Sequence, residues 1–149
     1  MSISDNLKKI NDRIKEAELK AGKKEGSVKL MAVSKFHPAE AVLEAVNAGQ
    51  FLFGENRVQE ASEKFPLIFE KNKNVELHII GSLQTNKVKN AVKYSACIQS
   101  VDRIDLIKEI EKQASKLNKT VRILLELHTG ESSKSGFANI EDMKKALEF

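Results

Sequence analysis

Short apolar runs alternate with longer amphipathic segments along almost the whole chain. The runs are rich in aliphatic residues and too short for buried helices, so we predict strands at residues 28–33, 51–53, 77–80, 96–101 and 121–127. Around them, apolar residues recur every three or four positions. This spacing predicts helices at residues 3–21, 39–49, 58–64, 66–69, 88–92, 104–117 and from residue 140 onward.

Three residues set the expected helix boundaries. Pro66 is expected to start a short helix of its own, because proline fits the first helical turn and fits poorly further inside. Asp102 and Asn139 are expected to act as N-caps of the last two helices, since their side chains can accept hydrogen bonds from free backbone amides.

The order of the elements predicts the fold class. An initial helix is followed by five strand-helix units, and strict alternation of this kind favours a parallel α/β sheet with right-handed crossovers. Two closures remain open, a doubly wound open sheet or part of a (β/α)8 barrel. A complete barrel needs about 250 residues, so 149 residues with five units cannot close one.

Lys35 is the first candidate for chemistry, because it follows the first apolar run at the carboxyl end of the predicted strand. Parallel α/β folds place their chemistry at this edge. A desolvated lysine amine can lose its proton and form a Schiff base with an aldehyde. The alternative is a lysine whose aliphatic stem packs on the strand end while its ammonium reaches solvent.

Polar clusters also follow three other predicted strands. They comprise residues 55–57, 82–87 and 132–136. In a parallel sheet these clusters would meet Lys35 at one edge and surround a small polar ligand. Each cluster by itself also has a purely structural explanation, since asparagines bond local backbone, glycines make turns, and a strand histidine such as His78 is commonly a hydrogen-bonded core residue.

Composition and charge narrow the function classes. The net charge is +4, with basic and acidic residues interspersed, which by itself does not indicate nucleic-acid binding. The basic run at residues 86–93 fits the solvent face of a helix, and no aromatic platform accompanies it. The single cysteine, Cys97, excludes an internal disulfide. The polar N-terminus and the absence of a long apolar stretch predict a soluble, cytoplasmic protein without a membrane span.

Familiar catalytic and phosphate-binding motifs are absent. Lys134 and Ser135 match only the last pair of the phosphate-binding loop of nucleotide hydrolases, whose glycines are replaced here by His128 and Ser133. No GxGxxG follows the first strand, and no GxSxG nucleophile elbow occurs. The three histidines lack metal-motif spacing, so no metal site is predicted.

Five motifs resemble, in order and spacing, the pyridoxal phosphate homeostasis proteins, whose fold is similar to the N-terminal barrel of alanine racemase. The motifs are LMAVSKFHP at residues 30–38, FGENRVQE at 53–60, LHIIGSLQTNKVK at 77–89, IQSVD at 98–102 and ESSKSGF at 131–137. The resemblance covers nearly the whole chain. It implies one cofactor-binding domain over residues 1–149, a (β/α)8 TIM-type barrel truncated at its C-terminus to about five strand-helix units.

The resemblance also implies the site. In that family the lysine of the AVSK motif, here Lys35, holds pyridoxal 5′-phosphate as a Schiff base. The same cavity is lined by the residues that correspond to Asn56, His78, Lys134, Ser135 and Gly136. The family's phosphate-binding loops follow the last strands of the barrel and have no counterpart in this sequence, so cofactor binding is expected to be weaker. Open strand edges are expected to favour self-association.

The implied function is intracellular pyridoxal 5′-phosphate homeostasis, with the cofactor carried rather than used in catalysis and with cofactor-dependent apoenzymes as candidate recipients. No catalytic residue is expected. One alternative is a pyridoxal-phosphate-dependent amino-acid racemase; that enzyme adds a second domain and a tyrosine base, whereas the one tyrosine here, Tyr94, falls on the helix after the third strand. The other alternative is a truncated remnant that no longer binds the cofactor.

Overall fold

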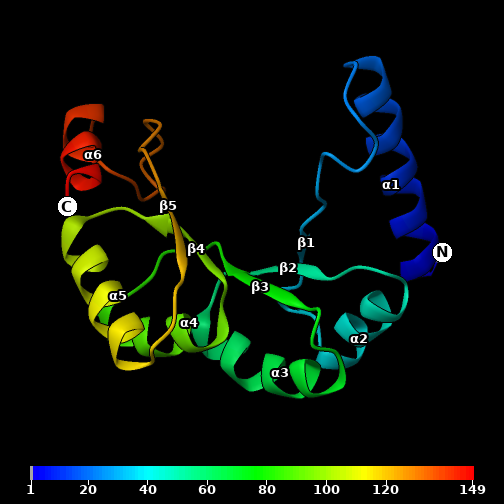
Figure 1. Cartoon of the computed structure of the whole chain (residues 1–149), viewed down its shortest axis with the longest axis horizontal. Coiled ribbons are helices and arrows are strands. Elements are labelled where there is room, and N and C mark those ends of the chain that lie inside the picture. The colour runs from blue at the N-terminus through cyan, green and yellow to red at the C-terminus, as the bar shows by residue number, and fades with distance from the viewer. Residues whose placement is uncertain (1) are drawn as a thin grey trace.

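Strands and helices alternate strictly in the computed structural model, which describes residues 2–149 (Figure 1). The elements are α1 (Ile3–Lys20), β1 (Ala32–Val33), α2 (Ala39–Asn47), β2 (Leu52–Glu55), α3 (Val58–Lys71), β3 (Glu76–Ile79), the 3₁₀ turn η1 (Thr85–Lys87), α4 (Val88–Tyr94), β4 (Cys97–Val101), α5 (Ile104–Lys116), β5 (Arg122–Leu125) and α6 (Ile140–Leu147).

The five strands form one parallel sheet in the order β1-β2-β3-β4-β5, which is also their order in the chain. The prediction of a parallel α/β fold is therefore confirmed. A helix connects each strand to the next one, and the two strands pair in parallel. All five carboxyl ends therefore lie at one edge of the sheet. The register aligns Val33, Gly54, His78, Cys97 and Arg122 across the sheet.

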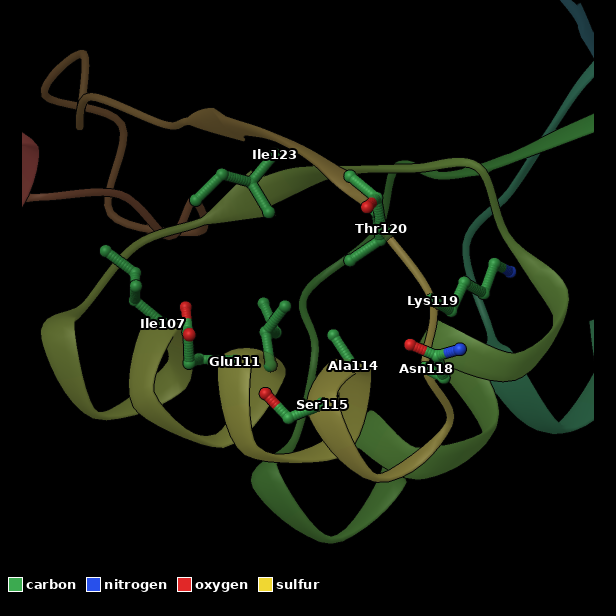
Figure 2. Close-up of a pocket in the computed structure, with 10 residues that line it drawn as sticks. Ile107, Glu111, Ala114, Ser115, Asn118, Lys119, Thr120 and Ile123 are labelled. Carbon is green, nitrogen blue, oxygen red and sulfur yellow. The ribbon is translucent and has the colours of Figure 1, made fainter.

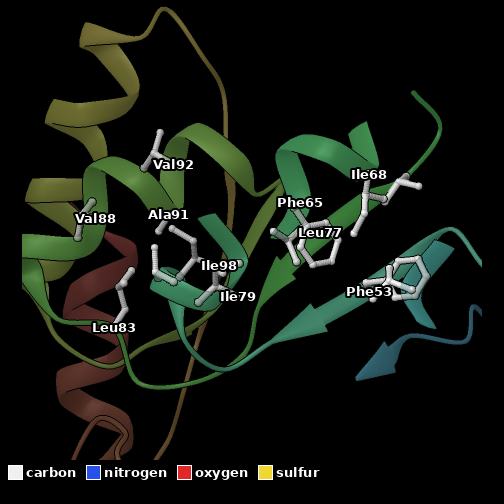
Figure 3. Close-up of a cluster of buried hydrophobic side chains, with 14 of the residues drawn as sticks. Phe53, Phe65, Ile68, Leu77, Ile79, Leu83, Val88, Ala91, Val92 and Ile98 are labelled. Carbon is white, nitrogen blue, oxygen red and sulfur yellow. The ribbon is translucent and has the colours of Figure 1, made fainter. Parts of the chain in front are cut away.

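Helices α2 to α5 cover one face of the sheet, and α1 and α6 stand at its two ends (Figure 1). The core fills the layer between these helices and the strands. Figure 3 shows Phe53, Leu77 and Ile98 of the strands packed against Phe65 and Val88 of the helices, all of them almost fully buried. Burial of a side chain of this size contributes about 1.5–3 kcal/mol. The strand face turned away from α2 to α5 carries no helix within residues 2–149.

The apolar residues whose spacing predicts a helix at residues 88–92 form the inner face of α4, since Val88, Ala91 and Val92 are all buried. The same reasoning was less successful for α1, in which Leu7 is buried but Ile10 is 41% exposed. This difference follows from the environment of each helix. Helix α4 lies between α3 and α5, whereas α1 packs mainly against one helix, α2.

Two predicted helix boundaries were wrong. Helix α3 continues through Pro66, because Phe65 and Ile68 on its inner face are completely buried and their packing outweighs the hydrogen bond that proline cannot donate. Asp102 does not cap α5. Its carboxylate accepts a hydrogen bond of 2.6 Å from the guanidinium of Arg103, and Arg103 is the N-cap residue. The predicted cap at Asn139 is confirmed, since its side chain accepts a bond of 2.9 Å from the Asp142 amide.

Strand β1 is shorter than the apolar run that predicts it. The carboxylate of Glu18, buried on α1, accepts hydrogen bonds from the amides of Gly26 and Val28 at 2.9 and 2.6 Å, and from the Ser27 hydroxyl at 3.1 Å. These bonds tie the incoming segment to α1, and regular pairing starts only at Ala32. The hydrogen bonds to Val28 and Gly26 hold the pKa of Glu18 below its usual value.

The described part of the chain has a shielded thiol, and it has neither a metal-binding cluster nor a membrane-spanning helix. Cys97 is buried in β4, and this burial raises the pKa of its thiol. Within residues 2–149 no cluster of histidine, cysteine and acidic side chains is arranged to hold a metal ion. None of the helices described is both long and apolar enough to cross a membrane.

Candidate functional site at the carboxyl edge of the sheet

Lys35 lies in the turn that follows β1, at the carboxyl edge of the sheet, as predicted. Strand pairing continues one residue past β1, because the Ser34 amide donates to the Gly54 carbonyl at 3.1 Å. Ser34 is buried on the helix-covered face of the sheet, and Lys35 follows it in the turn that leads to α2. The Lys35 side chain is half-buried, and within residues 2–149 its amine contacts only the Phe36 ring, 5.7 Å from the ring centroid.

A second lysine lies beneath this turn on the helix side. Lys64 of α3 is buried, and its amine lies 2.7 Å from the Glu55 carboxylate and 3.1 Å from the Glu60 carboxylate. It also donates to the carbonyl oxygens of Ser34 and His37 at 2.9 and 2.8 Å. From the sequence, Glu55 is expected among the polar residues around the ligand. In the structure it lies on the helix-covered side of the sheet, completely buried in this network.

Glu60 joins the same network to the backbone of the Lys35 turn. Its carboxylate accepts a 2.7 Å hydrogen bond from the Phe36 amide in addition to the contact with Lys64. Burial alone would raise the pKa of Glu60, but the bonds from Phe36 and Lys64 outweigh it and the pKa is lowered. The only sequence signal for this network is the four-residue spacing of Glu60 and Lys64 on one helix.

The exits of β2, β3 and β5 meet along the same edge. Gly81 packs directly against the backbone of Asn56, and the Ser82 hydroxyl donates to the Ser135 hydroxyl at 2.9 Å. Ser135 in turn donates to the Glu126 carboxylate at 3.1 Å. The predicted convergence of these polar loops is thus present in the structure, with contacts that run from the second strand to the loop after the fifth.

Asn56 borders a cavity of about 350 Å³ between the β2–α3 and β3–α4 connections. Two cationic side chains, Arg57 and Lys87, lie on its wall together with Ser82 and Gln84. Lys134 and Gly136 lie elsewhere in the loop after β5. Lys134 is exposed, with its amine 3.9 Å from the Glu131 carboxylate, and Gly136 packs on the backbone of His128.

His78 lies further from the carboxyl edge of the sheet than Lys35 and Asn56. It aligns with Val33 and Gly54, two residues before the level of Lys35 and Asn56, which is a separation of about 7 Å along the strands. Both of its ring nitrogens are engaged, Nε2 with Glu76 at 2.8 Å and Nδ1 with Gln99 at 2.8 Å. The histidine borders a cavity of about 430 Å³ that Arg122 and Glu76 also line. The hydrogen bond with His78 and the nearby Arg122 charge lower the pKa of Glu76.

A separate pocket of about 360 Å³ lies between α5 and β5 (Figure 2). It combines apolar side chains such as Ile107, Ala114 and Ile123 with the polar residues Ser115 and Asn118. None of the six residues that the sequence predicts for the cofactor site lines this pocket.

The sequence model of one family, described as the alanine racemase N-terminal domain, matches residues 6–149. The chain belongs to this family. Within it, the pyridoxal phosphate homeostasis protein of Aquifex aeolicus (strain VF5) is 37% identical over 149 residues, which are 100% of this chain and 64% of that protein. The chain therefore spans less than two thirds of the length of this relative. The family resemblance that the five motifs indicate is confirmed.

Solved structures of this family agree with the fold. The structure of PipY from Synechococcus elongatus PCC7942 with pyridoxal phosphate bound is 35% identical, has a TM-score of 0.76 and covers 93% of this chain and 62% of PipY. Alanine racemase from E. faecalis, with 18% identity and a TM-score of 0.66, covers 100% of this chain and 38% of the enzyme, and it supports the fold alone.

Proposed function

We propose that this member of the alanine racemase N-terminal domain family binds pyridoxal 5′-phosphate through Lys35 and takes part in homeostasis of that cofactor. The observation that carries the proposal is the position of the Lys35 amine and its lack of polar partners in the described part of the chain. It lies at the carboxyl edge of a parallel sheet and has no hydrogen-bond or ion-pair partner within residues 2–149. The name of the Aquifex aeolicus relative and the cofactor bound in PipY support this assignment.

The residues present fit an aldehyde cofactor. When bound, the group supplies an aldehyde carbon, and a primary amine can form a C=N bond to it with release of one water molecule. Lys35 offers such an amine, while the Lys64 amine is buried with four oxygen atoms within 3.1 Å, those of Glu55, Glu60, Ser34 and His37. We propose that Asn56 and Ser135 orient polar groups of the ligand at the same edge, and that His78, Lys134 and Gly136 make further contacts with the bound cofactor.

Several finer assignments belong to the same proposal. We propose that the five strand-helix units form one domain that is part of a (β/α)8 barrel, which the likeness to alanine racemase supports. A carrier without turnover is supported by Tyr94, the one tyrosine, which lies at the end of α4 and packs against the core. Cofactor-dependent apoenzymes in the cytoplasm are the proposed recipients.

The test is a visible absorption spectrum of the purified chain mixed with pyridoxal 5′-phosphate, followed by borohydride reduction and peptide mass spectrometry. We expect a new absorption band and a reduced adduct on Lys35. Lys35→Ala is expected to lack both, whereas Lys112→Ala, which removes an exposed lysine from α5, is expected to retain both. The absence of any adduct on Lys35 of the unmodified chain would overturn the proposal.

A further inference from the structure

The turn that carries Lys35 has an unusual backbone. Phe36 has a φ of +66°, in the left-handed region that residues with a Cβ rarely adopt, and its side chain is 75% exposed. The exposed ring therefore gains little from burial that could compensate for this conformation. The surrounding structure has to hold the turn in place.

The network beneath the turn supplies this restraint. The Lys64 ammonium donates to the carbonyl oxygens on both sides of Lys35 and Phe36, those of Ser34 and His37. The Ser34 hydroxyl donates to the Glu55 carboxylate at 2.7 Å, and the Phe36 amide donates to Glu60. Backbone and side-chain groups on both sides of Lys35 are thus fixed to α3 and β2, while Lys35 itself is not part of the network.

Burial of the charged groups in this network costs free energy, and a purely structural role would not require them. Glu55 and Lys64 are charged groups with side chains 0% and 6% exposed, and ion pairs buried this deeply lose much of their attraction to desolvation. The Glu55 Oε2 atom is buried and has no hydrogen-bond partner among the described residues. The presence of such groups next to a strained turn at the carboxyl edge of the sheet points to a role in positioning.

We propose that Ser34, Glu55, Glu60 and Lys64 are positioning residues, which hold the strained turn so that the Lys35 amine is presented at the carboxyl edge of the sheet. This inference rests on the proposed function in one respect, namely that the ligand which reacts with Lys35 is the aldehyde of pyridoxal 5′-phosphate. The network acts on the backbone, so it shapes the turn with or without a ligand.

The main experiment compares Lys64→Met with Lys119→Met. Lys119 is the control, because its amine also donates to backbone carbonyls, here those of Val92, Lys93 and Ser95 at the end of α4 rather than the two beneath Lys35. Two readouts are used. Hydrogen exchange of residues 34–37 is measured without cofactor, and the rate of borohydride-trapped adduct formation on Lys35 is measured with pyridoxal 5′-phosphate.

We expect Lys64→Met to speed exchange of the Phe36 amide and to slow adduct formation about tenfold or more, since small displacements of a reacting group have large effects on rate. Lys119→Met is expected to leave both unchanged once the folded fraction is taken into account. Equal effects of the two variants would overturn the inference and leave Lys64 a general stabilising residue.

Two further variants keep the test decisive. If Lys64→Met fails to fold, Glu60→Ala removes the acceptor of the Phe36 amide and one of the two ion pairs of Lys64, and it should show the same two effects, with Glu109→Ala on α5 as its control. Replacing Phe36 by asparagine, which tolerates the left-handed region, should restore most of the adduct rate to Glu60→Ala. No restoration combined with unchanged exchange would contradict the positioning role.

The two proposals fail in different ways. A chain that forms no adduct on Lys35 but shows faster exchange of the Phe36 amide in Lys64→Met would refute the proposed function and support the positioning network. Adduct formation on Lys35 at the same rate in the unmodified chain, Lys64→Met and Glu60→Ala would support the proposed function and refute the positioning network.

Discussion

Gly81 and Asn56 touch through their backbones at the carboxyl edge of the sheet. A Cβ atom at position 81 would lie 2.4 Å from the Asn56 carbonyl oxygen and 2.8 Å from its Cα. No side chain could move aside to relieve this contact, because both neighbours are main-chain atoms. The exits of β2 and β3 can therefore approach this closely only while residue 81 is glycine.

We expect Gly81→Ala to separate these two exits and to lower the free energy of unfolding by about 1–3 kcal/mol. Gly54→Ala is the matched control within β2. Its new Cβ would meet the ends of the Ile80 and Met31 side chains at 3.1 and 3.2 Å, and these can shift. Urea denaturation of both variants checks the difference, and an equal cost would show that the Asn56 contact is not limiting.

Truncation of Phe65 should be the most damaging single change in the core. Its side chain is 0% exposed, and its ring centroid lies 6.1 Å from that of Phe53 and 5.6 Å from that of Phe69. Phe65→Ala is expected to cost about 3–5 kcal/mol, from lost burial and the cavity left behind. Phe149→Ala removes a ring that is 66% exposed and should change stability by less than about 0.5 kcal/mol. Thermal unfolding of the two variants compares them directly.

Glu18 should make stability depend on acid pH. Its pKa is lower in the folded chain than the ordinary value of 4.5, because the amides of Val28 and Gly26 donate to the ionised carboxylate. The contribution is therefore fully present above about pH 4.5 and disappears as pH falls through the lower folded pKa. In Glu18→Gln, the decline in unfolding free energy below pH 4.5 should be shallower than in the unmodified chain. Urea midpoints measured from pH 3 to pH 6 test this, and parallel curves would contradict it.

Ser135 should control the order of the loop after β5. Ser135→Ala removes the acceptor of the Ser82 hydroxyl and the donor to Glu126. We expect a loss of about 0.5–1.5 kcal/mol and faster hydrogen exchange in residues 128–137. Ser133→Ala, an exposed change in the same loop, should leave exchange unaltered. Equal exchange in both variants would mean that the backbone alone orders the loop.

The general architecture could be predicted because it depends on properties that are local in the sequence. Apolar period and strand length were sufficient to predict five parallel strands that alternate with helices, and the buried side of α4, where Val88 lies, while the order of the strands in the sheet stayed open. The carboxyl-edge position of Lys35 follows from the same pattern. Helix α3 illustrates the limit, because Phe65 and Ile68 decide that the helix continues through Pro66, and their burial depends on strands distant in the chain.

The position of the candidate loops at the carboxyl edge of the sheet was predictable, whereas the contacts among their side chains were much less so. A carboxylate at a strand exit can point to either face, and the sequence alone does not reveal that Glu55 turns toward Lys64 rather than toward a ligand. The left-handed φ of Phe36 is also invisible in the sequence, since phenylalanine is an uncommon residue in that region. Both features arise from tertiary contacts with α3.

The burial of Cys97 has a practical consequence for all of these measurements. It is the one cysteine of the chain, it lies in the fourth of the five strands, and its thiol is both shielded and less acidic than a free one. A thiol-specific reagent can therefore modify the protein only after β4 is exposed. The rate of labelling reports openings of the sheet in an unmodified chain, and each variant described above can be ranked by it without a denaturant or an introduced probe.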